Sequence, residues 1–112
     1  MAPRMIPRIE PEEFSRRLAA GEPIYLIDVR QAWENDYCAL PDSILIPLPE
    51  LSSRLDEVTP PAGATVVVYC HHGIRSVTGA AILQQAGFAS AASLEGGIDA
   101  WSLRIDAGVK RY

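Results

Sequence analysis

Two short apolar segments constrain the fold of this chain most strongly. Residues 24–29 and 65–70 are almost continuously apolar and do not alternate with polar residues. A strand with one solvated face alternates, so we expect these two strands to be buried on both faces, as in a parallel sheet. Shorter strands are expected at residues 8–9, 43–47 and 91–94. Because helical patterns separate the strands, the sequence predicts an α/β fold with a mostly parallel sheet.

The helical patterns rest on apolar spacing and on turn residues at their ends. Helical segments are expected at residues 11–20, 31–37, 48–55 and 76–85, and after Gly97. The fourth segment contains small residues around Gly79, which would allow close packing on a sheet. In an open parallel sheet, ligands bind at the carboxyl ends of the strands.

Length and composition place limits on the function. The chain has 112 residues, of which 48% are hydrophobic, and this suits one domain over residues 1–112. Its net charge of −4 predicts no general attraction to nucleic acid or to an anionic membrane. No apolar segment approaches the roughly 20 residues of a membrane span. Residues 1–8, expected to form an extended arm, lack the apolar centre of a secretory signal, so we expect a cytoplasmic protein.

Cys70 is the principal candidate for chemistry. It ends the strand expected over residues 65–70, and a polar loop and a helix beginning near Arg75 follow it. The backbone N–H groups of such a loop, together with a helix N-terminus, form a site for an anion and favour a thiolate. The sequence therefore predicts that Cys70 is a nucleophile. Cys38 is expected to be structural, with a role as a resolving thiol as the alternative.

The residues around Cys70 are expected to shape its loop. Gly73 provides a backbone conformation that a side chain would obstruct, and Ser76 is expected to cap the following helix rather than donate to the sulfur. His71 and His72 are adjacent and are expected to point in different directions. Two consecutive ligands would crowd one ion, so no metal is expected there.

Two arginines near the expected site, Arg75 and Arg30, have two interpretations each. Arg75 is expected to brace the loop through Asp28 or Glu34, and binding of an anionic donor is the alternative. Asp28 and Arg30 are expected to form a structural pair near the site, with a donor-binding role for Arg30 as the alternative.

Taken in order, these motifs resemble the rhodanese-like sulfurtransferase domain. The resemblance covers residues 9–101. It rests on four motifs: Asp28-Val29-Arg30 with Trp33-Glu34; Ile44 to Leu48; Cys70-His71-His72-Gly73-Ile74-Arg75; and Leu94 to Gly97 with Ala100-Trp101. The resemblance implies a three-layer α/β domain with helices on both faces of the sheet.

The resemblance also implies an activity. Cys70 would take sulfane sulfur from a donor such as thiosulfate, carry it as a persulfide, and pass it to cyanide, a thiol or a protein acceptor. The active loop would be His71 to Ser76, including Ile74, and no separate cofactor is implied. The family usually has a histidine followed by Pro-Gly where this chain has Ala39 and Pro41-Asp42. Aspartate tolerates a left-handed turn, so we expect the fold to survive.

Two other functions compete with this one. The first is a sulfur-relay or regulatory module that binds a protein partner and has little activity on small molecules. The second is a phosphatase or arsenate reductase, because related folds use a cysteine loop around an oxyanion. Such loops normally have five residues between cysteine and arginine, whereas four lie between Cys70 and Arg75. The smaller loop favours a single sulfur atom.

Overall fold

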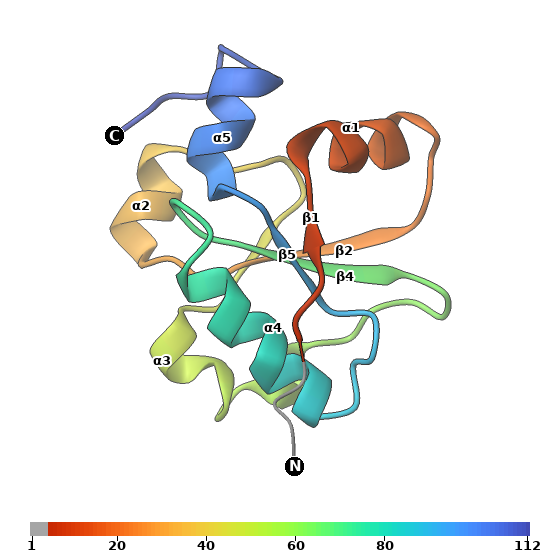
Figure 1. Cartoon of the computed structure of the whole chain (residues 1–112). Coiled ribbons are helices and arrows are strands. Elements are labelled where there is room, and N and C mark those ends of the chain that lie inside the picture. The colour runs from red at the N-terminus through yellow and green to blue at the C-terminus, as the bar shows by residue number, and fades with distance from the viewer. Residues whose placement is uncertain (1–4) are drawn as a thin grey trace.

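The computed structural model of the chain describes residues 5–112, so part of the arm expected over residues 1–8 lies outside the described residues. A five-stranded sheet forms the centre of the molecule (Figure 1), in the order β1-β5-β4-β2-β3. Its strands are β1 (Arg8–Ile9), β2 (Ile24–Asp28), β3 (Ile44–Leu45), β4 (Thr65–Tyr69) and β5 (Ala92–Leu94). Every pairing is parallel, as the two non-alternating strands predicted.

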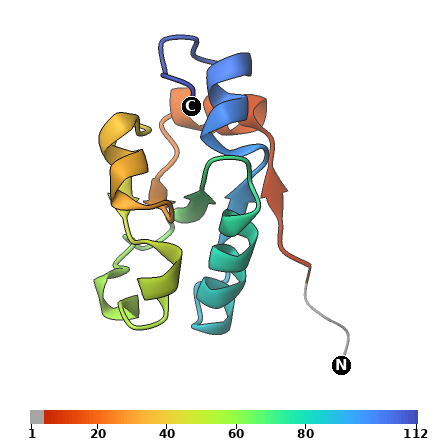
Figure 2. The same cartoon turned by 90° about the vertical axis from the view of Figure 1, so that its left-hand side faces the viewer.

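Helices lie on both faces of this sheet, which gives three layers. They are α1 (Pro11–Ala19), α2 (Ala32–Tyr37), α3 (Leu48–Leu51), α4 (Arg75–Gln85) and α5 (Gly97–Arg104), with a 3₁₀ turn at Leu55–Glu57. Figure 2 shows α1 and α5 on one side of the strands and α3 and α4 on the other. The three-layer α/β fold expected from the resemblance is confirmed. No helix among residues 5–112 is long and apolar enough to cross a membrane.

Neighbouring side chains of the central strands point into two different cores. Ile27 and Val68 pack in the core beneath α3 and α4, whereas Leu26 and Val67 pack in the core beneath α1 and α5. All four residues are at most 6% exposed. This burial on both faces explains why the sequence of β2 and β4 does not alternate. The two strands thereby hold their carboxyl ends side by side near the middle of the sheet.

Two elements are shorter than expected. The strand predicted at residues 43–47 is paired only over Ile44–Leu45, at the edge of the sheet. The helix predicted at residues 48–55 ends at Leu51. There the Ser53 hydroxyl donates to the Glu50 carbonyl at 2.9 Å, and such local side-chain bonds compete with a continuing helix.

Gly79 lets α4 lie close to the sheet, as the small residues at this point of the sequence predicted. A Cβ atom at this position would lie 3.2 Å from Cγ1 of Val68 and 3.3 Å from Cγ1 of Val29. We therefore expect Gly79→Val to lower the free energy of unfolding by about 1–3 kcal/mol, because the added methyl groups have no room. Urea denaturation measures this loss. The control Thr78→Val, at an exposed position of the same helix, should change it by less than about 0.5 kcal/mol.

Candidate active site

Cys70 lies immediately after β4, at the carboxyl end of the sheet, and is only 1% exposed. The loop behind it curls so that two backbone N–H groups donate to its sulfur. Gly73 N lies 3.1 Å from Cys70 Sγ, and Ser76 N, in the first turn of α4, lies 3.3 Å from it. These donors and the N-terminus of α4 create a site that favours negative charge on sulfur. The expected geometry around Cys70 is therefore present.

A second helix N-terminus orders the backbone of the same loop. The carbonyl of Cys70 accepts a hydrogen bond from Ile98 N at 2.9 Å, and the carbonyl of His71 accepts one from Asp99 N at 3.1 Å. Both N–H groups belong to the first turn of α5, where helix donors have no partner within the helix. A Cβ atom on Gly97 would lie 2.4 Å from the Cys70 carbonyl oxygen, so only glycine permits this approach. The sequence placed Gly97 at a turn, but it did not predict that the first turn of α5 binds the carbonyl groups of the loop.

Gly73 has the backbone conformation that the sequence led us to expect. Its φ angle is +94°, in the left-handed region that favours glycine. A Cβ atom at Gly73 would also lie 3.0 Å from the backbone nitrogen of Gly96. The next residue, Ile74, is 80% exposed and precedes α4. The loop is therefore tight at Gly73 and open to solvent at Ile74.

Arg75 braces the loop, and its partner is Glu34. The guanidinium donates to both carboxylate oxygens, at 2.7 and 2.9 Å. Glu34 also accepts from the backbone N–H of Gln31 at 3.0 Å, as part of a capping box on α2. The Arg75 hydrogen bond outweighs burial and lowers the pKa of Glu34 from 4.5 to about 2. Of the two partners considered for Arg75, the structure selects this one.

Asp28 and Arg30 form the expected structural pair. Arg30 Nη2 lies 2.7 Å from Asp28 Oδ2, Arg30 Nε lies 2.9 Å from Asp28 Oδ1, and both residues are fully buried. Arg30 also donates to the carbonyl of Cys38 at 2.7 Å, and its Nη1 lies 3.8 Å from the Cys38 sulfur. This burial leaves no open face on Arg30 for an anionic donor. Cys38 is partly buried against the same guanidinium.

The prediction that Ser76 caps α4 is wrong. Ile74 occupies the N-cap position, and Ser76 lies inside the helix. Its hydroxyl lies 3.4 Å from the Cys70 sulfur and 2.7 Å from the hydroxyl of Ser93 on β5. Both serines are buried, so each needs a polar partner inside the protein. The Ser76 hydroxyl therefore contacts the Cys70 sulfur, as its backbone N–H does.

The two histidines do not point in different directions. Their rings stack with centroids 3.8 Å apart and an interplanar angle of 30°. His72 is exposed, with Nδ1 3.8 Å from Asp99 Oδ2. His71 lies between His72 and Tyr112, and burial, with a smaller effect of His72, lowers the pKa of His71. Within residues 5–112, no group of three or more Cys, His, Asp or Glu side chains is arranged to hold a metal ion.

Tyr112 belongs to the site although no sequence motif indicated it. Its hydroxyl donates to Glu34 Oε2 at 2.6 Å and accepts from Arg30 Nη1 at 2.9 Å. Burial and the Glu34 carboxylate raise the pKa of Tyr112, so its hydroxyl stays protonated at neutral pH. Its partners precede it by 78 and 82 residues. Only the tertiary structure brings them together.

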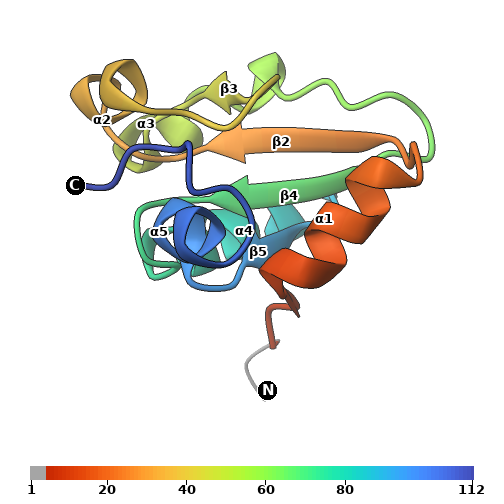
Figure 3. The ribbon, with the colours of Figure 1, turned by 90° about the horizontal axis from the view of Figure 1, so that it is seen from above.

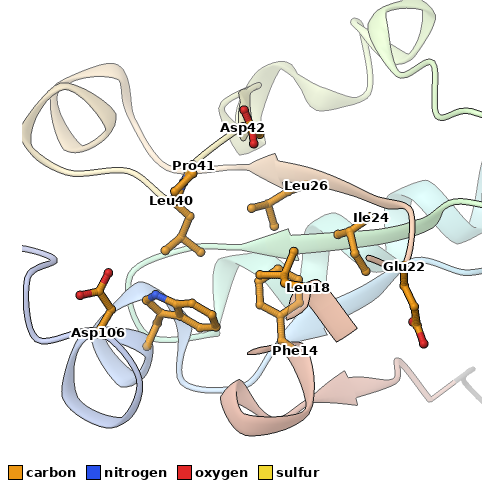
Figure 4. A pocket seen from close by; sticks show the side chains of 10 residues that line it. Phe14, Leu18, Glu22, Ile24, Leu26, Leu40, Pro41, Asp42 and Asp106 are labelled. Carbon is orange, nitrogen blue, oxygen red and sulfur yellow. The ribbon is translucent and has the colours of Figure 1, made fainter. Parts of the chain in front are cut away.

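A hollow away from Cys70 is a separate feature of the structure. A cavity of about 260 Å³ opens between α1, α5 and the segment before β3 (Figure 4). Its walls include Phe14, Leu26 and Trp101, and no cysteine or histidine lines it. The cavity is therefore mainly apolar, and its polar lining consists of carboxylates rather than a thiol or an imidazole.

Comparisons with known proteins bear on the family and the fold of this chain. A family model described as "Rhodanese-like domain" matches residues 10–104. A sulfurtransferase from Allochromatium vinosum is 36% identical over 98 residues, which are 88% of this chain and 90% of that protein. A probable adenylyltransferase/sulfurtransferase from Mycobacterium tuberculosis, MoeZ, is 35% identical over 104 residues, which are 93% of this chain and 26% of MoeZ. The structure of a thiosulfate sulfurtransferase from Pseudomonas aeruginosa matches with a TM-score of 0.79 and 29% identity, over 95% of this chain and 20% of that one.

The Glu34–Arg75 pair should make stability depend on pH. Because the pKa of Glu34 is about 2 in the folded protein and 4.5 is its ordinary value, the unfolded chain binds more protons between these values. The stabilisation is complete above pH 4.5 and is lost as the pH falls toward 2. We expect Glu34→Gln to lower the free energy of unfolding by about 3 kcal/mol at pH 7 and to flatten this acid dependence.

Urea denaturation of the two proteins between pH 2 and 7 measures both effects. The control is Glu13→Gln, which removes a partly exposed carboxylate 3.4 Å from Arg17. It should cost less than about 1 kcal/mol, as is usual for a surface pair. An equal loss of unfolding free energy in the two variants would contradict the stabilising role assigned to the Glu34–Arg75 pair.

Proposed function

The chain belongs to the rhodanese-like domain family, and on this premise we propose that it is a sulfurtransferase carrying sulfane sulfur on Cys70. The observation that carries the proposal is the pair of N–H groups, from Gly73 and Ser76, that face the Cys70 sulfur. A thiolate and a terminal persulfide are both anionic, so both are stabilised by such donors. The sulfurtransferases among the relatives support transfer of sulfur in general.

We propose thiosulfate, or another persulfide donor, as the source of sulfur. The Cys70 thiolate attacks the outer sulfur of thiosulfate, and a new S–S bond forms. The S–S bond of thiosulfate breaks at the same time, and sulfite leaves with its electron pair. The Ser76 hydroxyl, 3.4 Å from Cys70 Sγ, can stabilise the charge on this sulfur. No oxidant or metal ion is needed to balance the step.

The second half-reaction restores the thiolate. A nucleophile such as cyanide or a thiolate attacks the outer sulfur of the persulfide and takes that sulfur atom with it. The electron pair of the broken S–S bond returns to Cys70, where the same N–H groups stabilise it. Arg75 is not free to act on these ligands, because Glu34 engages its guanidinium through two hydrogen bonds. We propose that Arg75 keeps the loop in shape and does not bind the donor.

A sulfur relay to a protein acceptor is the second candidate. The observation that favours it is the match to MoeZ, a probable adenylyltransferase/sulfurtransferase of which this chain spans 26%. A relay would load Cys70 by the same first step. It would then transfer sulfur efficiently only to its own protein partner.

Thiocyanate formation separates the two candidates, and variants of the two cysteines test the part that each thiol takes. We expect the wild-type protein and Cys38→Ala to form thiocyanate from thiosulfate and cyanide at similar rates, and Cys70→Ala to lose at least about a hundredfold of this activity. Intact mass after exposure to thiosulfate should show the gain of one sulfur atom in the first two proteins. Cys70→Ala should show no gain.

Each other result has a distinct meaning. A persulfide on Cys70 without thiocyanate formation would favour the relay. Activity retained in Cys70→Ala would exclude Cys70 from the mechanism. If the wild-type protein showed no persulfide and no turnover, this result would contradict sulfur transfer from thiosulfate.

A further inference from the structure

We propose that Tyr112 is a positioning residue that holds the active loop, residues 70–76, from two sides. Its hydroxyl binds the carboxylate that braces Arg75, and its ring packs on His71, the residue after Cys70. The proposal deepens the proposed function, since it assigns a role in the same site to a residue outside the loop. Its structural part can be tested without sulfur transfer.

The first link runs through Glu34. Glu34 Oε2 accepts from Tyr112 at 2.6 Å and from Arg75 Nη2 at 2.9 Å, so one oxygen joins the end of the chain to the start of α4. The Tyr112 hydroxyl also accepts from Arg30 Nη1 at 2.9 Å. Tyr112 therefore connects the Asp28–Arg30 pair with the Glu34–Arg75 pair. Without the hydroxyl, each pair would lose a partner in a site that is largely closed to water.

The second link runs through His71. The rings of His71 and Tyr112 are nearly parallel, with centroids 3.8 Å apart and an interplanar angle of 6°. Among residues 5–112, Nε2 of His71 is buried and finds no hydrogen-bond partner. Stacking on His72 and Tyr112 therefore contributes to holding the ring in place. Because His71 follows Cys70 directly, a change in the position of its ring is transmitted to the loop backbone.

The last residues are themselves held in place, so Tyr112 has a firm support. Figure 3 shows the chain after α5 returning across the carboxyl ends of the strands, between α2 and α5. The Ser102 hydroxyl donates to the Val109 carbonyl at 2.7 Å, and Arg111 Nε lies 2.9 Å from Asp99 Oδ1. On the other side, Trp33 and Tyr37 of α2 pack edge-on against Tyr112, with centroids 5.7 and 5.8 Å away. Tyr112 thus joins α2 to the active loop.

Hydrogen exchange of individual amides tests this role directly. The N–H groups of Gly73 and Ser76 face the Cys70 sulfur, so their exchange rates report the loop geometry. In Tyr112→Ala we expect both to exchange about tenfold faster, while Val67 and Val68 in β4 keep their rates. Tyr112→Phe keeps the ring on His71 but lacks the hydroxyl, so its rates should lie between those of the wild-type protein and Tyr112→Ala.

Kinetics with thiosulfate and cyanide provide the second readout. Tyr112→Ala should lower kcat about three- to tenfold and leave KM for thiosulfate within about twofold, because loop geometry acts on the reacting sulfur more than on binding. The kcat of Tyr112→Phe should lie between that of Tyr112→Ala and that of the wild-type protein. Lys110→Ala is the matched control, since Lys110 lies in the same segment and contacts Tyr37 rather than the loop. It should change neither readout.

Three results would overturn the positioning role. The first is unchanged exchange at Gly73 and Ser76 in Tyr112→Ala. The second is an equal acceleration at Val67 and Val68, which would show a loss of general stability. The third is the same effect in Lys110→Ala. A wild-type protein without sulfur transfer would contradict the proposed function, but the exchange rates would still decide the role of Tyr112.

Discussion

Two buried carboxylates near the carboxyl end of β2 determine how the active loop is held. Asp28 and Glu34 are almost inaccessible to water, and a carboxylate in such a place needs a positive partner with good geometry. For Asp28, the positive partner is Arg30, two residues later in the chain. For Glu34 the partner is Arg75, 41 residues later, and this pair joins α2 to the start of α4. The loop that contains Cys70 ends at Arg75, so the buried carboxylate fixes one end of the loop.

The two helices beside this loop have complementary effects on its backbone. The first turn of α5 binds the carbonyl groups of Cys70 and His71. The loop can then direct N–H groups, rather than carbonyl oxygens, toward the sulfur. The first turn of α4 adds the Ser76 N–H and the positive end of its dipole. The Cys70 sulfur is therefore faced by backbone N–H donors, and no lysine side chain among residues 5–112 is hydrogen-bonded to it.

The sequence predicted the parts of this arrangement that local patterns encode. The apolar segments at residues 24–29 and 65–70 identified the buried strands, and the cysteine, glycine and arginine of the loop identified the site. The stacking of His71 on Tyr112 and the contact of Ser76 with Cys70 were not predictable from spacing. They depend on how α4 packs against β5, where Ser93 bonds to Ser76, and on where Tyr112 lies. Short elements were also predicted poorly, because the edge strand at Ile44–Leu45 has few interactions that define its ends.

The departures at Ala39 and Asp42 show how the fold compensates for a changed motif. Asp42 adopts a φ of +61°, the left-handed conformation for which glycine is the usual residue. The segment is anchored elsewhere, because Arg30 binds the Cys38 carbonyl and the Tyr69 hydroxyl binds Leu40 N at 3.1 Å. Neither anchor needs a histidine at position 39 or a glycine at position 42. The backbone path is therefore set by two buried residues, Arg30 just after β2 and Tyr69 at the end of β4, and positions 39 and 42 are both exposed.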